Sequence, residues 1–169
     1  MIINNYYKIN SKNINYDISS DILKRYGKNI PIIVCLGTNR VLSDMVGVFV
    51  ADYLKARKIP TYIFGGTKFE VNKSAIKYIA NKFKTKNILI VDSGLLYQKN
   101  AILFSNYTIL NNGEVLNIPC ICCNTIFVEN KKINLSKVKY AQIIKYAKIV
   151  SNSICDYFSY VKLINTKFA

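Results

Sequence analysis

Three short apolar runs alternate along the chain with stretches whose apolar residues recur at helical spacing. The runs are residues 30–36, 60–64 and 87–91, and the helical stretches are residues 43–57 and 76–83. Short runs without polar alternation are typical of parallel strands, because helices cover such strands on both faces. Strands that alternate with helices imply right-handed crossovers. The sequence therefore predicts an α/β fold, a three-layer α/β/α domain with a mostly parallel central sheet.

The remaining elements are arranged around this unit. A chain of 169 residues with 51% hydrophobic residues is long enough to fold around one core. Residues 1–29 are polar, and we expect an N-terminal appendage there, followed by a single α/β domain at residues 30–169. Residues 111–113 (Asn-Asn-Gly) predict a hairpin turn. Residues 118–123 predict one more buried strand, and residues 140–161 carry a helical stripe.

Composition favours a cytoplasmic protein. Residues 1–8 lack a basic segment leading into an apolar stretch, and no apolar run approaches the roughly 18 residues of a membrane span. The five cysteines are an odd number and lie mostly in apolar runs, which suits buried thiols in a reducing cytosol. We therefore expect no membrane partner.

The formal charge of +15 at pH 7 would ordinarily indicate nucleic acid or an anionic surface as a partner. The excess comes from lysines scattered along the chain, without an arginine cluster. The densest basic stretch, residues 82–86, falls at the expected end of a helix, where cations are favourable. Scattered lysines are typical of solvated surface, so we expect no nucleic-acid partner.

Histidine is absent from the chain, and this excludes several kinds of site. A Ser/His/Asp triad and a Cys/His dyad are both impossible. The common zinc sites also use histidine, so we expect no tightly held metal and no cofactor. Gly37, Gly65 and Gly66 lie between a predicted strand and a predicted helix. Backbone N–H groups there can hold an anion, although glycines are also ordinary turn residues at such strand ends.

Two of the nine acidic residues occupy informative positions. Asp44 opens the helix after the first predicted strand, and Asp92 closes the third predicted strand. In a doubly wound sheet these strands are commonly neighbours, and ligands bind beyond their carboxyl ends. Two carboxylates in one crevice can share a proton and act as acid and base on water, or they can hold a divalent cation. Each acid alone has a structural explanation, at a helix N-terminus or a strand end, but their joint placement favours a site.

Several segments resemble the signature of a known family. Residues 35–40 (CLGTNR) and 43–47 (SDMVG) resemble the pattern C-I-G-T-D-R-x-x-G-D-x-L-G-P of the YyaC family, sporulation proteins usually described as spore proteases. Residues 90–95 (IVDSGL) are similar to that family's I-A-I-D-A-C-L. Asn124 falls on the asparagine of its I-T-G-I-V-N strand end. The resemblance covers about residues 30–160.

The same layout looks like that of the germination protease and the hydrogenase maturation proteases. Both place an acid at the position of Asp44, and the germination protease has an aspartate at the position of Asp92. The hydrogenase maturation proteases carry a G-G-T like residues 65–67, and their acids bind a metal. The resemblance implies a phosphorylase/hydrolase-like fold of the hydrogenase maturation protease kind. It also implies peptide hydrolysis by an acid pair, or metal-assisted cleavage of one dedicated protein substrate.

The chain departs from the family pattern close to the acids. The family aspartate before Arg40 is Asn39, and a family histidine falls at Asn72. Because that extra ligand is missing, we expect a proton shared by Asp44 and Asp92 rather than a bound metal. Glu70, in the loop after the second predicted strand, is the acid that can replace the lost one.

These observations predict an aspartate-dependent peptidase that acts on a protein or peptide substrate during sporulation or germination. It would act in the cytoplasm of the sporulating cell, in the forespore or inside the spore. Asp44 and Asp92 are the predicted catalytic residues. The predicted substrate-binding residues are Asn39, Gly65, Gly66, Glu70 and Asn124. Two alternatives stay open: a non-catalytic sporulation protein that binds a partner through the same crevice, and a small phosphate- or nucleotide-binding domain.

Overall fold

The structure is a computed structural model that describes residues 4–85, 87–126, 128–129, 132–134 and 137–167. The strands of its central sheet are β1 (Asn4–Lys8), β2 (Ile32–Cys35), β3 (Ile63–Phe64), β4 (Ile88–Gly94), β5 (Ala101–Ser105) and β8 (Cys120–Asn124). Two small hairpins consist of β6 (Thr108–Ile109) with β7 (Val115–Leu116), and β9 (Val128–Glu129) with β10 (Lys132–Ile133). The helices are α1 (Ile14–Tyr26), the 3-10 helix η1 (Leu42–Asp44), α2 (Val46–Ala56), α3 (Ala75–Phe83) and α4 (Tyr140–Lys167).

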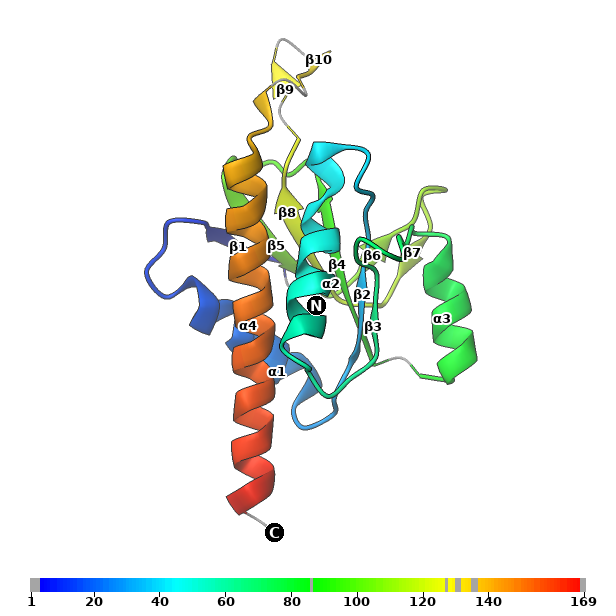
Figure 1. The fold of residues 1–169 in the computed structure, drawn as a ribbon, viewed down its shortest axis with the longest axis vertical. Helices are drawn as coiled ribbons and strands as arrows, with labels where there is room; N and C mark the ends of the chain where they lie inside the picture. Colours follow the sequence, from blue (N-terminus) through cyan, green and yellow to red (C-terminus); the bar gives the residue numbers. More distant parts are fainter. Residues whose placement is uncertain (1–3, 86, 127, 130–131, 135–136, 168–169) are drawn as a thin grey trace.

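The predicted three-layer α/β/α architecture is confirmed. Within the described residues the sheet has the order β1-β5-β8-β4-β2-β3, and β8, β4, β2 and β3 run parallel. β5 and β1 extend it in antiparallel pairing. Helices α1, α2 and α4 cover one face, while α3 and the β6–β7 hairpin lie on the other (Figure 1).

The central strands are apolar throughout because both of their faces are covered. In β2, Ile33 and Cys35 pack toward α2 and α4, while Ile32 and Val34 pack toward α3. Each such fully buried side chain contributes about 1.5–3 kcal/mol relative to an exposed one. This two-sided burial explains why the sequence shows continuous apolar runs here rather than strict alternation.

Several predicted elements differ in length from those observed. The second strand is only Ile63–Phe64, shorter than the predicted residues 60–64. The helix predicted at residues 43–57 is divided into η1 and α2. The hairpin turn at residues 111–113 is confirmed, with Gly113 at a φ of 80°. None of the helices in the described part of the chain has both the length and the apolar character needed to cross a membrane.

The prediction that residues 1–29 form an appendage is wrong for the residues described. Strand β1 pairs with β5 as an edge strand of the main sheet. In α1, Ile14, Ile18 and Ile22 are buried in the same core as α4. The Tyr26 hydroxyl donates to the Ile88 carbonyl oxygen at 2.5 Å. An apolar residue at every fourth position is enough to bury one helix face, although the surrounding sequence is polar.

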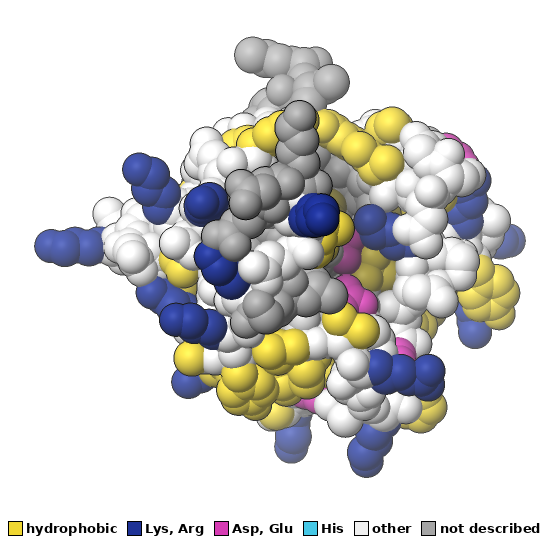
Figure 2. Space-filling model, turned by 90° about the horizontal axis from the view of Figure 1, so that it is seen from above, with side chains coloured by type: hydrophobic (Ala, Val, Ile, Leu, Met, Phe, Trp, Pro, Cys, Tyr) yellow, Lys and Arg dark blue, Asp and Glu magenta, His cyan; other side chains and the backbone are white. Residues whose placement is uncertain are grey.

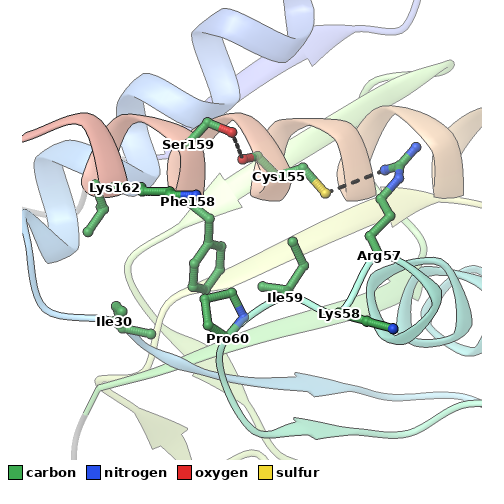
Figure 3. Close-up of a pocket in the computed structure, with 10 residues that line it drawn as sticks. Ile30, Arg57, Lys58, Ile59, Pro60, Cys155, Phe158, Ser159 and Lys162 are labelled. Atoms are coloured by element: carbon green, nitrogen blue, oxygen red, sulfur yellow. Dashed lines mark hydrogen bonds between the residues drawn. The ribbon is translucent and has the colours of Figure 1, made fainter. Parts of the chain in front are cut away.

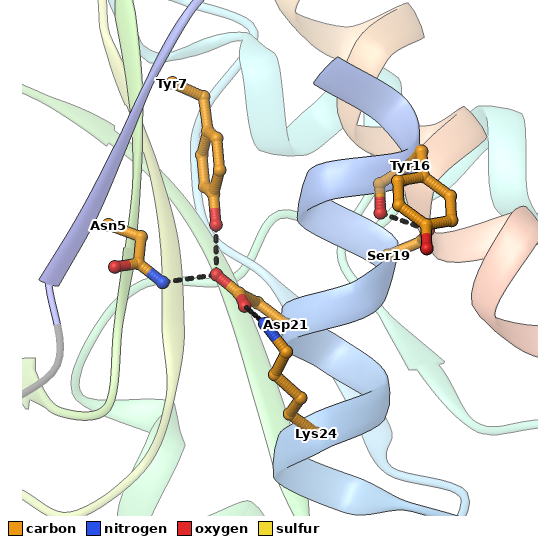
Figure 4. A network of polar contacts seen from close by, with 6 residues as sticks. All are labelled: Asn5, Tyr7, Tyr16, Ser19, Asp21 and Lys24. Atoms are coloured by element: carbon orange, nitrogen blue, oxygen red, sulfur yellow. Dashed lines mark hydrogen bonds and ion pairs between the residues drawn. The ribbon is translucent and has the colours of Figure 1, made fainter. Parts of the chain in front are cut away.

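A polar network fixes β1 against α1 (Figure 4). The Asp21 carboxylate on α1 accepts hydrogen bonds from the Tyr7 hydroxyl and the Asn5 amide of β1, and from Lys24 at 3.0 Å. Burial by itself raises the pKa of Asp21, but the hydrogen bonds from its three partners outweigh burial and lower the pKa below its ordinary value. Burial and the bond to Asp21 raise the pKa of the Tyr7 hydroxyl, which therefore stays a donor.

We expect Tyr7→Phe to lower the free energy of unfolding at neutral pH by about 1–3 kcal/mol, because the Asp21 carboxylate loses a donor. Since the folded pKa of Asp21 is depressed, its contribution is present above the unfolded pKa and is lost as pH falls through the folded pKa. The deficit should therefore shrink at about pH 3. Denaturant titrations at both pH values measure it, with Tyr16→Phe, an exposed tyrosine of α1, as the control. An equal deficit at both pH values would contradict this account of Asp21.

Candidate functional site

Asp44 and Asp92 line one cavity of about 520 Å³ at the carboxyl edge of the sheet. Strands β2 and β4 are parallel neighbours, Asp44 lies in η1 after β2, and Asp92 lies near the end of β4. From β2 the chain continues to β3 on one side, and from β4 it continues to β5 on the other. The cavity therefore lies at the topological switch point, where α/β sheets bind ligands. Seen from this edge, acidic side chains lie in a hollow ringed by apolar and basic ones (Figure 2).

Two glycines allow η1 to sit directly against the end of β2. Gly37 has a φ of 144°, and a Cβ added to it would lie 2.1 Å from the Asp44 carbonyl oxygen. A Cβ on Gly47, at the start of α2, would lie 1.9 Å from the Leu36 carbonyl oxygen. Any side chain at either position would push the 3-10 turn away from the sheet. The glycines thus hold Asp44 over the strand end.

Asp92 is paired with a lysine that the sequence analysis did not identify. Its Oδ2 lies 3.1 Å from the Lys73 ammonium, and its Oδ1 accepts the Ser93 backbone N–H at 2.8 Å. Burial works against the charge of Lys73, but Asp92 outweighs burial and raises the lysine pKa above its usual value. Lys73 therefore stays a cation and forms an ion pair with the Asp92 carboxylate. No spacing marks this residue among the many lysines of the chain.

The surroundings of Asp44 disfavour its charge, whereas Asp92 has the Lys73 ammonium beside it. Burial, and then the charge of Asp92, raise the pKa of Asp44 above its ordinary value. The Thr38 backbone N–H and the Ser93 side chain oppose this shift without cancelling it. The Ser93 hydroxyl is close enough to act on Asp44 but makes no hydrogen bond of normal geometry. The two carboxyl groups thus have different surroundings: burial and the charge of Asp92 raise the pKa of Asp44, while Asp92 is ion-paired to Lys73.

Glu70 lines the same cavity and orders the loop after β2. Its carboxylate accepts the Thr38 hydroxyl at 3.0 Å and the Asn39 backbone N–H at 2.8 Å. The Asn39 N–H has the largest effect on Glu70 and lowers its pKa. Asn39 itself is exposed and contributes its backbone to this contact. Asn72 also lines the cavity.

Gly65 and Gly66 are not among the residues that line this cavity. A Cβ on Gly65 would lie 2.3 Å from the Cys35 carbonyl oxygen, so this glycine allows close packing of the strand ends. The backbone N–H of Thr67, the residue after Gly66, donates to the Asp52 carboxylate at 3.2 Å. An acid of the protein therefore occupies the position where the loop would hold an anion.

Asn124 is buried and also lies outside the lining of the cavity. Its amide donates to the Gln98 carbonyl oxygen at 2.7 Å and accepts the Leu96 backbone N–H at 3.3 Å. These contacts fix the loop that follows β4. Asn124 therefore supports the loop beside Asp92 and is not part of the lining of the cavity.

The donor set does not suit the metal that the resemblance to hydrogenase maturation proteases implies. Among the described residues, no three His, Cys, Asp or Glu side chains are gathered to hold a metal ion. The Lys73 ammonium already neutralises Asp92, and a divalent cation there would be repelled by it. The residues that surround Asp44 and Asp92 thus fit acid–base chemistry.

A second cavity, of about 570 Å³, lies beside the amino ends of β2 and β3 (Figure 3). Its lining includes the apolar side chains of Ile59, Pro60 and Phe158, and Arg57 donates a hydrogen bond to the Cys155 sulfur at 3.4 Å. The described residues that line it include no Asp or Glu. It therefore brings together none of the predicted site residues.

We expect Asp44→Asn to raise the unfolding midpoint at neutral pH, because it removes a charge that burial and Asp92 disfavour. The folded pKa of Asp44 lies above the unfolded one, so the ionised side chain destabilises the fold as pH rises through the folded pKa. Below the unfolded pKa both states are protonated, and the gain should vanish. Thermal unfolding over a pH series measures it, with Asp156→Asn on the exposed face of α4 as the control. A less stable Asp44→Asn at neutral pH would disprove the inferred burial cost.

The family of the chain follows from comparison with known proteins. No curated protein matches the chain. The model of the family described as "Protein of unknown function (DUF1256)" matches residues 2–153. This match covers both acids, Lys73 and every strand of the sheet. The chain therefore belongs to the DUF1256 family of proteins of unknown function.

Proposed function

We propose that the protein is a YyaC-like spore protease, an aspartate-dependent peptidase that cleaves a protein substrate during sporulation or germination. The observation that carries the proposal is the unequal pair of acids in one cavity, with Asp44 biased toward its neutral form and Asp92 ion-paired to Lys73. Such a pair supplies an acid and a base at the same pH. The resemblance of residues 35–47 to the YyaC signature supports the biological setting.

The geometry suits general acid–base hydrolysis of a peptide bond. The Asp92 carboxylate takes a proton from water, whose oxygen attacks the carbonyl carbon, while neutral Asp44 gives its proton to the carbonyl oxygen. The C–N bond of the resulting diol then breaks. Asp92 returns its proton to the leaving amine, and Asp44 takes a proton back from one hydroxyl of the diol, which leaves the product carboxylic acid. Lys73 pairs with the Asp92 carboxylate and orients it before each turnover.

The phosphate- or nucleotide-binding alternative fits the site less well. Among the described residues that line the cavity, the basic side chain is Lys73, which already pairs with Asp92, and the Glu70 carboxylate would oppose a phosphate. The Thr67 N–H in the glycine loop is already bonded to Asp52. The non-catalytic alternative, a sporulation protein that binds a partner through this cavity, is separated from the peptidase by experiment.

We expect Asp44→Asn and Asp92→Asn each to lower the rate of substrate cleavage by about 10²–10⁴-fold, since each removes one proton-transfer group. The substrate is identified first, as a protein that accumulates uncleaved in a sporulating strain that lacks the gene. Complementation with each variant, followed by quantification of the uncleaved protein, measures the effect. Asp156→Asn, an exposed acid of α4, serves as the matched control.

The outcome of that complementation separates the two functions. Uncleaved protein should accumulate with both site variants and should be processed with the control. If the strains carrying the site variants process every protein and sporulate and germinate normally, the acid pair is not the function. A defect in sporulation without any accumulated precursor would favour the non-catalytic binding role.

We expect chelation of divalent cations to leave the cleavage rate unchanged, because Lys73 already supplies the positive charge beside Asp92. The purified protein is assayed on the identified substrate with and without a chelator. Chelator added to the Asp156→Asn protein controls for effects on the fold. Complete loss of activity, restored by one divalent ion, would overturn the metal-free mechanism.

A further inference from the structure

A groove of about 390 Å³ continues from the candidate site toward the edge of the sheet. Lys73, Asp92 and Ser93 line both the groove and the acidic cavity. Of the described residues that line the groove, only Lys73 and Asp92 have charged side chains, and these two pair with each other. The groove is therefore electrically neutral beyond the ion pair, in a protein of formal charge +15.

The register of the strands places four side chains in one row along the floor of this groove. Asp92 is paired with Cys122, Cys122 with Leu103, and Leu103 with Tyr6. Cross-strand partners point to the same face of a sheet, so the row runs from the acid on β4 to the edge strand β1. At about 4.8 Å between strands the row is about 14 Å long. This matches about four residues of an extended peptide at about 3.3 Å each.

Apolar side chains form the rim of the groove and are unusually exposed. Leu95 is 55% exposed and Tyr97 is fully exposed in the loop after β4, and Ile109 of β6 is 49% exposed. Thiol chemistry does not explain the surface, because burial raises the pKa of Cys122 to about 12 and keeps it protonated. Exposed apolar side chains grouped around a groove are typical of a binding surface.

We infer that this groove is the specificity pocket of the peptidase and binds an aliphatic or aromatic side chain next to the scissile bond. The inference rests on the proposed function, because the groove can act as a specificity pocket only if Asp92, which lines it, takes part in peptide hydrolysis. A charged substrate side chain would find no free partner there, since Lys73 and Asp92 already pair. An apolar one would gain about 25 cal/mol for each Å² of apolar surface that it buries against Leu103 and the rim.

The test uses the purified full chain and a peptide library made from the proteome of the sporulating host. Mass spectrometry maps the peptide bonds that wild type cleaves and that Asp44→Asn does not. We expect Leu, Ile, Met, Phe or Tyr to be enriched at one position beside the cleaved bond. Leu95→Ser should lower kcat/KM for such peptides by about tenfold or more, relative to peptides with a small side chain there.

Leu163→Ser is the matched control, because Leu163 on α4 is 57% exposed and lies outside the groove. It should leave both kcat/KM and the preference unchanged. Cleavage that depends on Asp44 but shows no apolar preference would disprove the role of the groove in specificity. The proposed peptidase activity would still hold. If the preference is unchanged in both Leu95→Ser and Leu103→Ser, the groove does not determine specificity. If no cleavage depends on Asp44, the proposed peptidase activity is disproved, and the role of the groove in specificity is disproved as well.

Discussion

The parallel pairing of β2 with β4 is the interaction on which the rest of the structure depends. Both strands are buried on both faces, so their backbone hydrogen bonds are shielded and their carboxyl ends are fixed side by side. The chain leaves the two strands in opposite directions, which opens the crevice between them. Asp44 and Asp92 come close together only because this pairing holds.

Much of this arrangement can be predicted from the sequence, because strands buried on both faces appear as continuous apolar runs. The apolar runs predict β2, β4 and β8, and periodicity predicts α3 and α4. The joint position of Asp44 and Asp92 follows from topology alone, since acids at the ends of neighbouring parallel strands must share an edge. Glu70 also lies at this edge.

The features that the sequence did not disclose depend on contacts between distant segments. Lys73 reaches Asp92 through the path of the loop before α3, and local spacing contains no sign of that path. The apolar stripe of α1 is sparse, so its burial is visible only once α4 lies beside it. Gly65 and Gly66 looked like ligand-binding turns, whereas their lack of a Cβ serves close packing and the contact with Asp52.

The unfavourable setting of Asp44 also bears on the history of the chain. An acid that weakens its own fold at neutral pH is readily replaced by a neutral residue once its chemistry is no longer needed. The fold itself therefore gives no reason for an acid at this position, and the proposed chemistry is what offsets its cost.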